Sequence, residues 1–352
     1  MKDFIIVGSG LSGSCLAYRL ERLGRSFVVF NDHSQEASKV AGGLMNPVVL
    51  KRFTLAAKAD EQLETAIEFY SGMEEHLGKK FLNPLEIYRR FSSVEEQNNW
   101  FLAADNKRLA PFLETELVPQ VNEHIQGQHA FGKVLKTYRI NLRYLLDSYS
   151  NHLQEKGMLK NDTFDYGGLS INESGVDYKG IKAKNIIFCE GFGLLKNPYF
   201  NYLPLRGNKG EYIYIKAPGL NLEVSVKSSV FIIPVEEDTY AVGATYSNTD
   251  KTPNPTAAAR EELLEKLRNL ISIDFEVIDQ AAAIRPTTID RRPLIGRHPR
   301  YSSLFTCNGF GSRGILIAPS ISEELLNFIN EGKPLDPDTN ISRFTKKWHK
   351  ES

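Results

Sequence analysis

The chain has 352 residues, a length that suits two domains or one large domain with an insertion. Its 43 Lys and Arg residues balance its 43 Asp and Glu residues, so no net field attracts nucleic acid or an anionic membrane. No apolar run approaches the roughly 20 residues of a transmembrane helix, which argues against a membrane span.

The first thirty residues have the pattern of one βαβ unit. The apolar run from Phe4 to Val7 predicts a buried parallel strand, and a glycine-rich turn follows it directly. Apolar residues then recur at helical spacing as far as Gly24, and residues 26–30 predict the next strand. Because the chain enters a strand at once, we expect no signal peptide.

The turn reads Gly8-Ser9-Gly10-Leu11-Ser12-Gly13, which is G-x-G-x-x-G set between a strand and a helix. Gly8 permits the tight turn, Gly10 lets the backbone approach a pyrophosphate, and Gly13 lets helix and strand pack closely. The helix N-terminus then offers N–H donors and the positive end of the helix dipole to phosphates. The pattern predicts dinucleotide binding rather than a purely structural turn.

The second strand ends at Asn31 and Asp32, where an acidic residue normally binds the ribose hydroxyls of a dinucleotide. Asn31 stands where we expect that carboxylate, and Asp32 follows it, so either side chain can accept a hydrogen bond from a hydroxyl. No basic residue stands at this point, which argues against a 2′-phosphate and hence against NADP.

The next part of the chain leaves the first unit and returns to it. Residues 35–49 are a small-residue loop, which favours close passage of the backbone past a bulky ligand; a mobile connector is the alternative. Residues 56–77 predict an amphipathic helix, and residues 81–131 predict an excursion into a second domain. Residues 132–135 and 142–153 predict the return, through a strand and an amphipathic helix.

The second half of the chain adds a buried strand and an antiparallel region. Residues 186–193 predict a strand that ends at Gly191, a second point where backbone can approach a ligand. Residues 205–245 contain alternating strand-like pieces split by turns, which predicts an antiparallel sheet. Residues 255–271 predict a helix that begins at Thr256.

The closing block repeats the arrangement of the first turn. Residues 304–308 predict a strand, which passes through Gly309-Phe310-Gly311-Ser312-Arg313-Gly314 into the apolar helix of residues 315–329. Two glycine turns before helix N-termini, near opposite ends of the chain, require one long ligand that spans both or two ligands. A long dinucleotide with a large planar head satisfies the first case.

The three cysteines argue against a metal site and against disulfides. Cys15, Cys189 and Cys307 each lie in an apolar run, without the spacing of metal ligands or of a disulfide framework. We therefore expect buried thiols, no bound metal and a cytoplasmic protein.

Taken together, these stretches resemble the FAD-dependent D-amino-acid oxidase and glycine oxidase superfamily. The motifs are GSGLSG at residues 8–13, VAGGLMNP at residues 40–47, IRPTTIDRRPLIGRHP at residues 284–299 and NGFGSRGILIAPS at residues 308–320. The loop AGGLMNPV and the ending GFGSRGILIAPSISEELL also resemble the C-terminal oxidase half of the bifunctional enzyme that remodels the tRNA wobble uridine. No methyltransferase half is present.

The resemblance implies an α/β fold with two interleaved domains. A Rossmann-like FAD-binding domain with a mostly parallel sheet would take residues 1–80, 132–203 and 284–352. A second domain, an antiparallel sheet that covers the flavin and binds substrate, would take residues 81–131 and 204–283. The flavin is expected to be non-covalent, because no Cys or His stands in a recognised attachment context.

The residues implied to bind FAD lie in the glycine turns, in the small-residue loop and at strand ends. They are Gly8, Gly10, Leu11, Ser12 and Gly13 at the pyrophosphate, Asn31 and Asp32 at the ribose, Gly42, Gly43, Leu44 and Met45 beside the ring, Phe164 in the strand-like DTFDY at the adenine, and Gly309, Phe310, Gly311, Ser312, Arg313, Gly314 and Ile315 at the pyrimidine end, with Ser38 and Gly191 also assigned to the cofactor. A helix N-terminus at the pyrimidine end would stabilise the negative charge of the reduced flavin.

The resemblance also implies that Arg285 binds a substrate carboxylate. A planar guanidinium can donate two parallel hydrogen bonds to a carboxylate; an arginine paired with an acid between the domains is the alternative. The tyrosine that amino-acid oxidases carry over the flavin is missing around Phe231, which leaves the substrate open. Another hydroxyl can come from Tyr212, Tyr214 or Tyr246.

We therefore expect an FAD-dependent enzyme that oxidises a C–N bond of a small amine or amino acid, with dioxygen or a quinone as electron acceptor. Lys209 is a candidate for a place near the ring, where it would help dioxygen accept electrons; a surface lysine is the alternative. A modified tRNA wobble uridine is a second substrate hypothesis, against which the zero net charge argues. A redox-inert FAD-binding protein is a third hypothesis.

Overall fold

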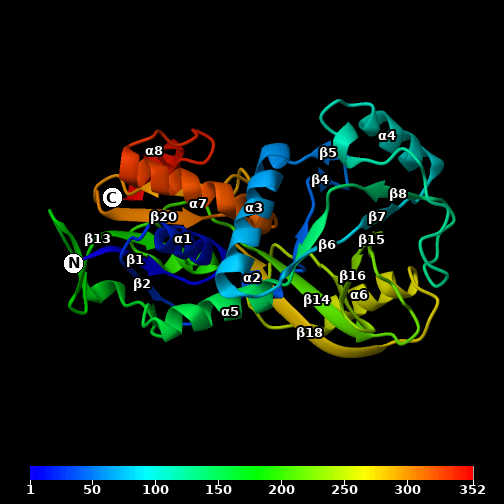
Figure 1. Ribbon diagram of the computed structural model, residues 1–352, viewed down its shortest axis with the longest axis horizontal. Helices are drawn as coiled ribbons and strands as arrows, with labels where there is room; N and C mark the ends of the chain where they lie inside the picture. The colour runs from blue at the N-terminus through cyan, green and yellow to red at the C-terminus, as the bar shows by residue number, and fades with distance from the viewer. Residues whose placement is uncertain (352) are drawn as a thin grey trace.

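Two large sheets organise the computed structural model, which describes residues 1–351 (Figure 1). The first sheet has the order β10-β2-β1-β13-β12-β11, and β20 with β19 joins it at the end of β13. Its strands are β1 (Lys2–Val7), β2 (Phe27–Phe30), β10 (Leu159–Lys160), β11 (Leu169–Asn172), β12 (Gly175–Tyr178), β13 (Ile181–Phe188), β19 (Leu294–Arg297) and β20 (Leu304–Asn308).

The middle of this sheet is parallel. The strands β10, β2, β1, β13 and β20 run in one direction, whereas β11, β12 and β19 are antiparallel to their neighbours. In the register, Val7 pairs with Phe30 and Phe188, and Phe188 pairs with Thr306. The carboxyl ends of four strands therefore lie level at one edge, where ligands bind in open parallel sheets.

Helices cover one face of the first sheet. Because alternate side chains of β1 point to opposite faces of the sheet, they enter two different cores. Phe4 and Ile6 enter a core shared with four helices, whereas Ile5 and Val7 enter a second core beneath β11 and β12. The four helices are α1 (Leu11–Arg22), α3 (Ala59–Leu77), α5 (Leu142–Glu155) and α7 (Gly314–Glu331).

The second sheet has the order β18-β14-β17-β16-β15-β7-β8 and is antiparallel except between β15 and β7. Its strands are β7 (Ile87–Arg90), β8 (Phe131–Val134), β14 (Asn208–Lys216), β15 (Ser225–Lys227), β16 (Phe231–Glu236), β17 (Thr239–Gly243) and β18 (Glu276–Arg285). The helix α6 (Ala257–Arg268) packs against Ile213 and Ile215 on one face. The other face, which carries Gly210 and Tyr212, is left for a ligand.

Shorter elements connect these parts. The short strands are β3 (Leu44–Met45), β4 (Val48–Val49), β5 (Thr54–Leu55), β6 (Leu82–Pro84) and β9 (Tyr138–Ile140). The other helices are α2 (Ala37–Val40), α4 (Val94–Ala104) and α8 (Thr345–Glu351), with 3-10 turns at Ala110–Phe112, Tyr166–Gly168, Gly191–Lys196 and Ile341–Phe344. As the sequence predicts, α6 follows Thr256, whose hydroxyl accepts a hydrogen bond from the Ala259 N–H.

The expected fold class, a mostly parallel sheet with a separate antiparallel sheet, is confirmed. One local expectation is wrong: residues 162–166 are not a strand, and Phe164 lies in the connection after β10. The Asp165 carboxylate accepts a hydrogen bond from the Gly167 N–H at 2.9 Å and starts a 3-10 turn there instead. The domain boundary expected at residue 132 falls inside β8.

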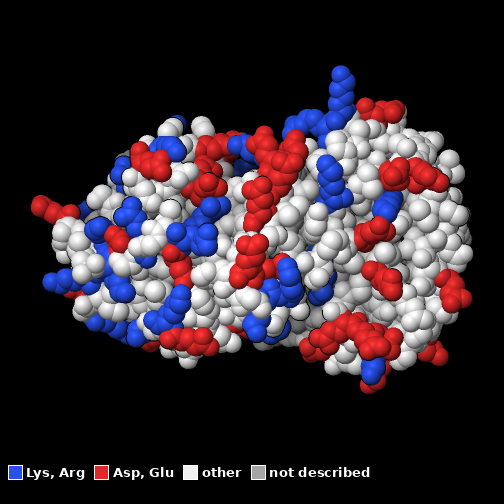
Figure 2. All heavy atoms as spheres, in the orientation of Figure 1, with Lys and Arg blue, Asp and Glu red and all other residues white. Residues whose placement is uncertain are grey.

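Figure 2 shows charges of both signs over this face, with acidic side chains gathered in a row along α3 and in a second group near α6. The row consists of the exposed side chains of Glu61, Glu64, Glu68 and Glu75. In the part of the chain that the structure describes, every helix is too short or too polar to cross a bilayer.

Candidate functional site

A cavity of about 1440 Å³ lies between the carboxyl edge of the first sheet and the open face of the second. Gly8, Gly191 and Gly309 line it from the first sheet, and Gly210 and Arg285 line it from the second. Small-molecule pockets usually measure about 300–1,000 Å³, so this cavity has room for an extended ligand and a small second molecule.

The N-terminus of α1 opens into this cavity without a side-chain cap and without an acidic residue in its first turn. A Cβ at Gly8 would lie 2.4 Å from the Cys189 carbonyl oxygen, and a Cβ at Gly13 would lie 1.9 Å from the Gly8 carbonyl oxygen. A Cβ at Gly10 would meet only the Ser38 hydroxyl, at 3.5 Å. The protein itself therefore needs glycine at 8 and 13, whereas Gly10 keeps space free for a ligand.

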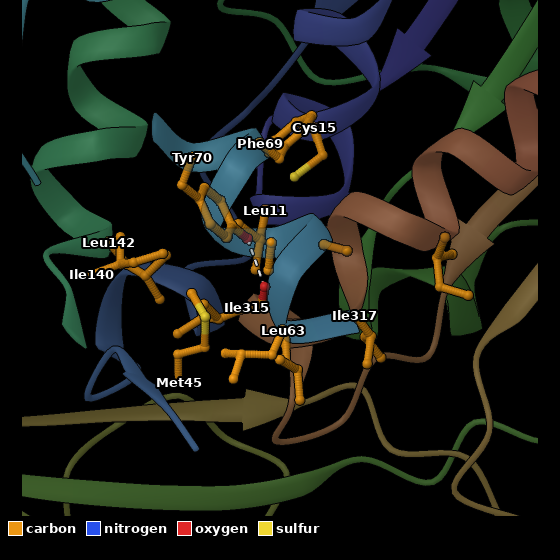
Figure 3. Packing of buried hydrophobic residues seen from close by; sticks show 14 of the residues in the cluster. Leu11, Cys15, Met45, Leu63, Phe69, Tyr70, Ile140, Leu142, Ile315 and Ile317 are labelled. Atoms are coloured by element: carbon orange, nitrogen blue, oxygen red, sulfur yellow. Dashed lines mark hydrogen bonds between the residues drawn. The ribbon is translucent and has the colours of Figure 1, made fainter. Parts of the chain in front are cut away.

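The N-terminus of α7 opens into the same cavity and is likewise uncapped. A Cβ at Gly314 would lie 3.3 Å from the Leu11 side chain, so the starts of α7 and α1 are in contact. Tyr70, on α3, donates a hydrogen bond at 2.9 Å to the carbonyl oxygen of Ile315, as Figure 3 shows. Two positive helix ends thus meet in one cavity, which suits an anionic ligand.

Asn31 and Asp32 both line the cavity, but they have different roles. The Asn31 side-chain oxygen Oδ1 accepts a hydrogen bond from the Ser9 N–H at 3.4 Å and so holds the glycine turn. Burial raises the pKa of Asp32, but hydrogen bonds from Ser34 outweigh it, so the pKa lies below its ordinary value. Asp32 therefore provides the charged acceptor at this end.

Glu190 follows β13 and lies buried beside Asp32 on the cavity wall. Its carboxylate accepts hydrogen bonds from the Tyr166 hydroxyl and, at 2.7 Å, from the Asn197 amide. Burial raises the pKa of Glu190 to about 7 despite these donors. Between about pH 4.5 and pH 7, the folded protein therefore keeps a proton on Glu190 that the unfolded chain releases.

We expect this proton to make stability depend on pH. The pKa of Glu190 is about 7 in the folded state against 4.5 for an ordinary glutamate, so its contribution is complete below pH 4.5 and is lost as the pH rises to about 7. The loss amounts to about 3 kcal/mol. Denaturant unfolding at pH 5 and pH 7.5 should show that Glu190→Gln weakens this decline; an equal decline in both proteins would contradict the assignment.

Arg285 is the last residue of β18 and points into the cavity. Its guanidinium donates a hydrogen bond at 2.8 Å to the Asn208 side-chain oxygen. A Cβ at Gly210 would lie 2.0 Å from Nη2, so the guanidinium occupies the space that this glycine leaves. Burial lowers the pKa of Arg285, and no carboxylate among residues 1–348 forms an ion pair with it. The structure therefore does not contain the alternative arrangement, in which Arg285 would pair with an acidic residue between the domains.

The sheet wall beside Arg285 carries a phenol, an aromatic ring and an ammonium group. The Tyr212 ring lies over Gly243, and a Cβ at Gly42 would lie 3.0 Å from its hydroxyl. Lys227 Nζ lies 4.8 Å from the centre of the Phe231 ring. Burial, together with two neighbouring cations, lowers the pKa of Lys227 to about 8. Tyr246 also lines the cavity, whereas Tyr214 is not part of its wall.

Most of the residues expected to bind the cofactor line this one cavity. They are Gly8, Gly10, Ser12, Asn31, Asp32, Ser38, Gly42, Gly43, Leu44, Phe164, Gly191, Gly309, Phe310, Gly311, Ser312, Arg313, Gly314 and Ile315. Leu11 and Met45 lie in the core beneath it (Figure 3), and Gly13 is packed against Gly8. The Ser12 hydroxyl donates its one proton to the Cys307 carbonyl oxygen at 2.7 Å, so its backbone N–H is the donor that remains for a ligand.

Lys209 does not reach the cavity. Its side chain is 1% exposed, and its ammonium lies 2.5 Å from an Asp250 carboxylate oxygen and 2.5 Å from the Asn254 carbonyl oxygen. It is therefore a buried, paired lysine, and neither a ring-side position nor a surface position describes it.

The sequence analysis did not assign many residues of the cavity wall, among them Glu190, Gly210, Lys227 and Asn308. Asn308 joins two loops, because its amide donates to the Gly191 carbonyl oxygen at 2.9 Å and its oxygen accepts from the Gly309 N–H at 2.7 Å. Gly210 offered a signal, since a glycine inside a strand indicates a close approach. Lys227 offered none, because its place depends on the pairing of β15 with β16.

A family model, related sequences and solved structures were each similar to this chain, and the three comparisons agree with one another. Residues 3–327 match the family model described as FAD dependent oxidoreductase, DAO. Glycine oxidase of Bacillus licheniformis is 24% identical over 353 aligned positions, which cover 93% of this chain and 92% of that protein. The bifunctional protein MnmC of Marinobacter nauticus, named for tRNA 5-methylaminomethyl-2-thiouridine biosynthesis, is 22% identical, with 96% of this chain and 57% of that protein covered. The crystal structure of glycine oxidase from Geobacillus kaustophilus has a TM-score of 0.81 at 20% identity, with 97% of each chain covered.

Proposed function

The chain belongs to the DAO family of FAD-dependent oxidoreductases, and on that premise we propose that it oxidises the C–N bond of a small amine or amino acid held by Arg285. The observation that carries the proposal is the Arg285 guanidinium, which faces the cavity without a carboxylate partner in the described chain. An arginine that is buried without a counter-ion favours an anionic ligand, and a carboxylate matches its planar geometry.

The residues present fit FAD, the family's cofactor. Two uncapped helix N-termini meet in the cavity, Gly10 leaves space beside the first, and Asp32 offers a charged acceptor at the far end. The loop of Gly42 and Gly43 and the turn of residues 309–314 would hold the flavin. This proposal includes residues 1–80, 132–203 and 284–352 as the FAD-binding domain, and residues 81–131 and 204–283 as the substrate-binding domain.

When bound, FAD supplies the hydride acceptor for the carbon next to the amine nitrogen. Arg285 would fix the substrate carboxylate with two parallel hydrogen bonds, while Tyr212 and Phe231 would shape the space around the amine. The N-terminus of α7 would stabilise negative charge at the pyrimidine end. The carbon next to a neutral amine nitrogen can lose hydride directly and leave a protonated imine, so this step requires no further acid or base. Water then hydrolyses the imine to the oxo acid and ammonia or an amine.

Either dioxygen or a quinone can serve as the acceptor in this proposal. Lys209 is not available to assist dioxygen, because its ammonium pairs with Asp250 inside the protein. The cavity over the sheet counts against a redox-inert FAD protein, since a structural cofactor needs no adjoining space for a substrate.

Anaerobic mixing of the FAD-loaded protein with a panel of amino acids and N-substituted glycines tests the proposal. We expect at least one compound to bleach the flavin absorbance and to release the corresponding oxo acid. If dithionite bleaches the flavin but no compound of the panel does, the small-substrate assignment is wrong.

A modified tRNA base is a second candidate because exposed basic side chains line the cavity mouth. Lys51 and Arg52, between β4 and β5, and Arg291, after β18, are exposed and belong to the wall. Phosphate contacts dominate nucleic-acid affinity and make it fall with salt.

Transfer RNA binding at 50 and 200 mM salt separates the two candidates. A tRNA substrate predicts binding that weakens with salt, and that weakens further in Lys51→Ala with Arg52→Ala. Absent or salt-insensitive binding, together with bleaching by a small amine, would leave the first candidate alone.

A further inference from the structure

A second cluster of ligand-type side chains lies at the far end of α1, on the side away from the cavity. Glu21 comes from α1, His76 from α3 and His152 from α5. Glu21 is about 16 Å along the helix from Gly10, at 1.5 Å per residue. None of the three residues belongs to the cavity wall.

The three side chains bring their polar atoms together at one point. The two Nε2 atoms of His76 and His152 lie 3.2 Å apart. His152 Nε2 lies 2.8 Å from one Glu21 oxygen, and His76 Nε2 lies 3.2 Å from the other. Their side chains are only 11% to 20% exposed, so water has limited access to these atoms.

Hydrogen bonds alone cannot satisfy this arrangement. Each of the three contacts needs one proton between its two atoms, and the carboxylate brings none. Each imidazole Nε2 carries at most one proton, so at most two of the three contacts can be hydrogen bonds. A cation at the centre would accept a lone pair from all three groups at once.

We propose that Glu21, His76 and His152 bind a divalent transition-metal ion of the zinc class, with a water molecule at the fourth position. Zinc bound at about 2.0–2.1 Å in a tetrahedron separates its ligand atoms by about 3.3 Å. The contacts among the two Nε2 atoms and the two Glu21 oxygens measure 2.8 to 3.2 Å, and one ligand atom from each residue lies within 4.8 Å of the other two. Two imidazoles with one carboxylate suit zinc, nickel or cobalt, whereas calcium and magnesium prefer oxygen ligands alone.

The surroundings hold the ligands in place. The Tyr149 hydroxyl lies 3.3 Å from a Glu21 oxygen, and the Tyr149 ring stacks on the His152 ring. The Tyr18 ring meets His76 edge-on. Such outer contacts fix ring orientation at metal sites.

Lys156 is the competitor for this site. Its ammonium lies 2.7 Å from Glu21 Oε1, where it would repel a metal ion, but its side chain is 46% exposed and can turn into solvent. It balances the Glu21 carboxylate when no metal is bound.

The sequence predicted no metal because these residues lie on three separate helices, without the short spacing that marks a local site. Their approach depends on how α1, α3 and α5 pack together. A bound ion would join these three helices and stabilise the folded protein, since it binds that state alone.

The test uses the FAD-loaded protein, stripped with a chelator and dialysed against zinc chloride. We expect one zinc per chain by elemental analysis, a raised thermal midpoint, and visible cobalt absorption beyond the flavin bands when Co²⁺ replaces zinc. His76→Ala and His152→Ala should each weaken zinc binding at least about 50-fold, because losing even an outer partner of a metal ligand costs about 10- to 100-fold in affinity. Lys156→Met should tighten it.

His124→Ala is the matched control and should leave zinc binding unchanged, because His124 pairs with the exposed Glu123 at 3.8 Å and does not belong to the cluster. FAD absorbance of each variant reports that the fold is retained. Zinc binding absent below 100 µM, or equal in His76→Ala and the parent, would overturn the site and leave a hydrogen-bonded cluster. This outcome is independent of the proposed oxidation, because neither histidine belongs to the cavity.

Discussion

Replacing Gly10 with valine is expected to leave a folded protein that no longer binds FAD. Gly10 has φ −66°, which a valine can adopt, and the nearest atom to its Cβ would be the Ser38 hydroxyl at 3.5 Å. The folded protein therefore has room for a Cβ at this position, which lines the cavity. In the proposed placement, the FAD pyrophosphate must approach the backbone at Gly10, so a valine side chain there would exclude it.

The expected weakening of FAD binding is at least about 100-fold, or about 2.7 kcal/mol. Absorbance of the purified variant and titration of its apoprotein with FAD measure it. Circular dichroism shows whether the helices are intact.

Gly24→Ala supplies the opposite case at the other end of the same helix. Gly24 has φ +63° with open space around it, so an alanine strains the backbone and lowers stability by roughly 1 kcal/mol without touching the cavity. The Gly24→Ala protein should be less stable than the parent but should keep its full FAD content, measured by flavin absorbance. A Gly10→Val protein with its full FAD content would refute the placement of the pyrophosphate.

The elements around Gly10 could be predicted from sequence because their signals are local. A strand, three spaced glycines and a helical repeat lie within one short stretch, and each constrains only its neighbours. By contrast, no local signal shows that Gly10 and Gly311 line the same cavity. Their proximity follows from the parallel pairing of β1, β13 and β20 and from the contact between Gly314 and Leu11.

Lys209 shows that a shift of one residue along a strand decides which face of the sheet a side chain occupies. Successive side chains of a strand point to opposite faces, so Lys209 and Gly210 cannot both face the cavity. Ile213 and Ile215 pack against α6, and counting back in twos places Lys209 on their side. This signal was present in the sequence, but it needed the knowledge of which face the helix covers.

Lys227, Glu190 and the cluster of Glu21, His76 and His152 had no such signal. The position of each group depends on which strands pair or which helices pack together. Contacts between residues far apart in the chain determine that arrangement. Apolar periodicity determines which face of an element is buried. It does not determine which polar side chains meet there.

Replacing Arg285 with methionine should abolish most activity while FAD stays bound. The side chain keeps its bulk but loses the two hydrogen bonds that we propose to the substrate carboxylate, each worth about 1.5–3 kcal/mol when charged. We expect kcat/KM for an amino-acid substrate to fall about 10² to 10⁴-fold. Steady-state oxidation and the rate of anaerobic flavin bleaching measure it, and unchanged FAD absorbance shows that the cofactor site is intact.

Arg285→Lys and Gly210→Ala show whether geometry or charge is responsible. Lysine keeps the charge but cannot donate two parallel hydrogen bonds, so its activity should lie between those of the parent and the methionine variant. Alanine at 210 keeps the arginine but puts a Cβ 2.0 Å from Nη2, so it must displace the guanidinium and should reproduce much of the loss. If Arg285→Met retains activity within tenfold on every substrate, the carboxylate lies elsewhere. Full activity in Gly210→Ala would mean that charge alone, and not the position of the guanidinium over that glycine, governs binding.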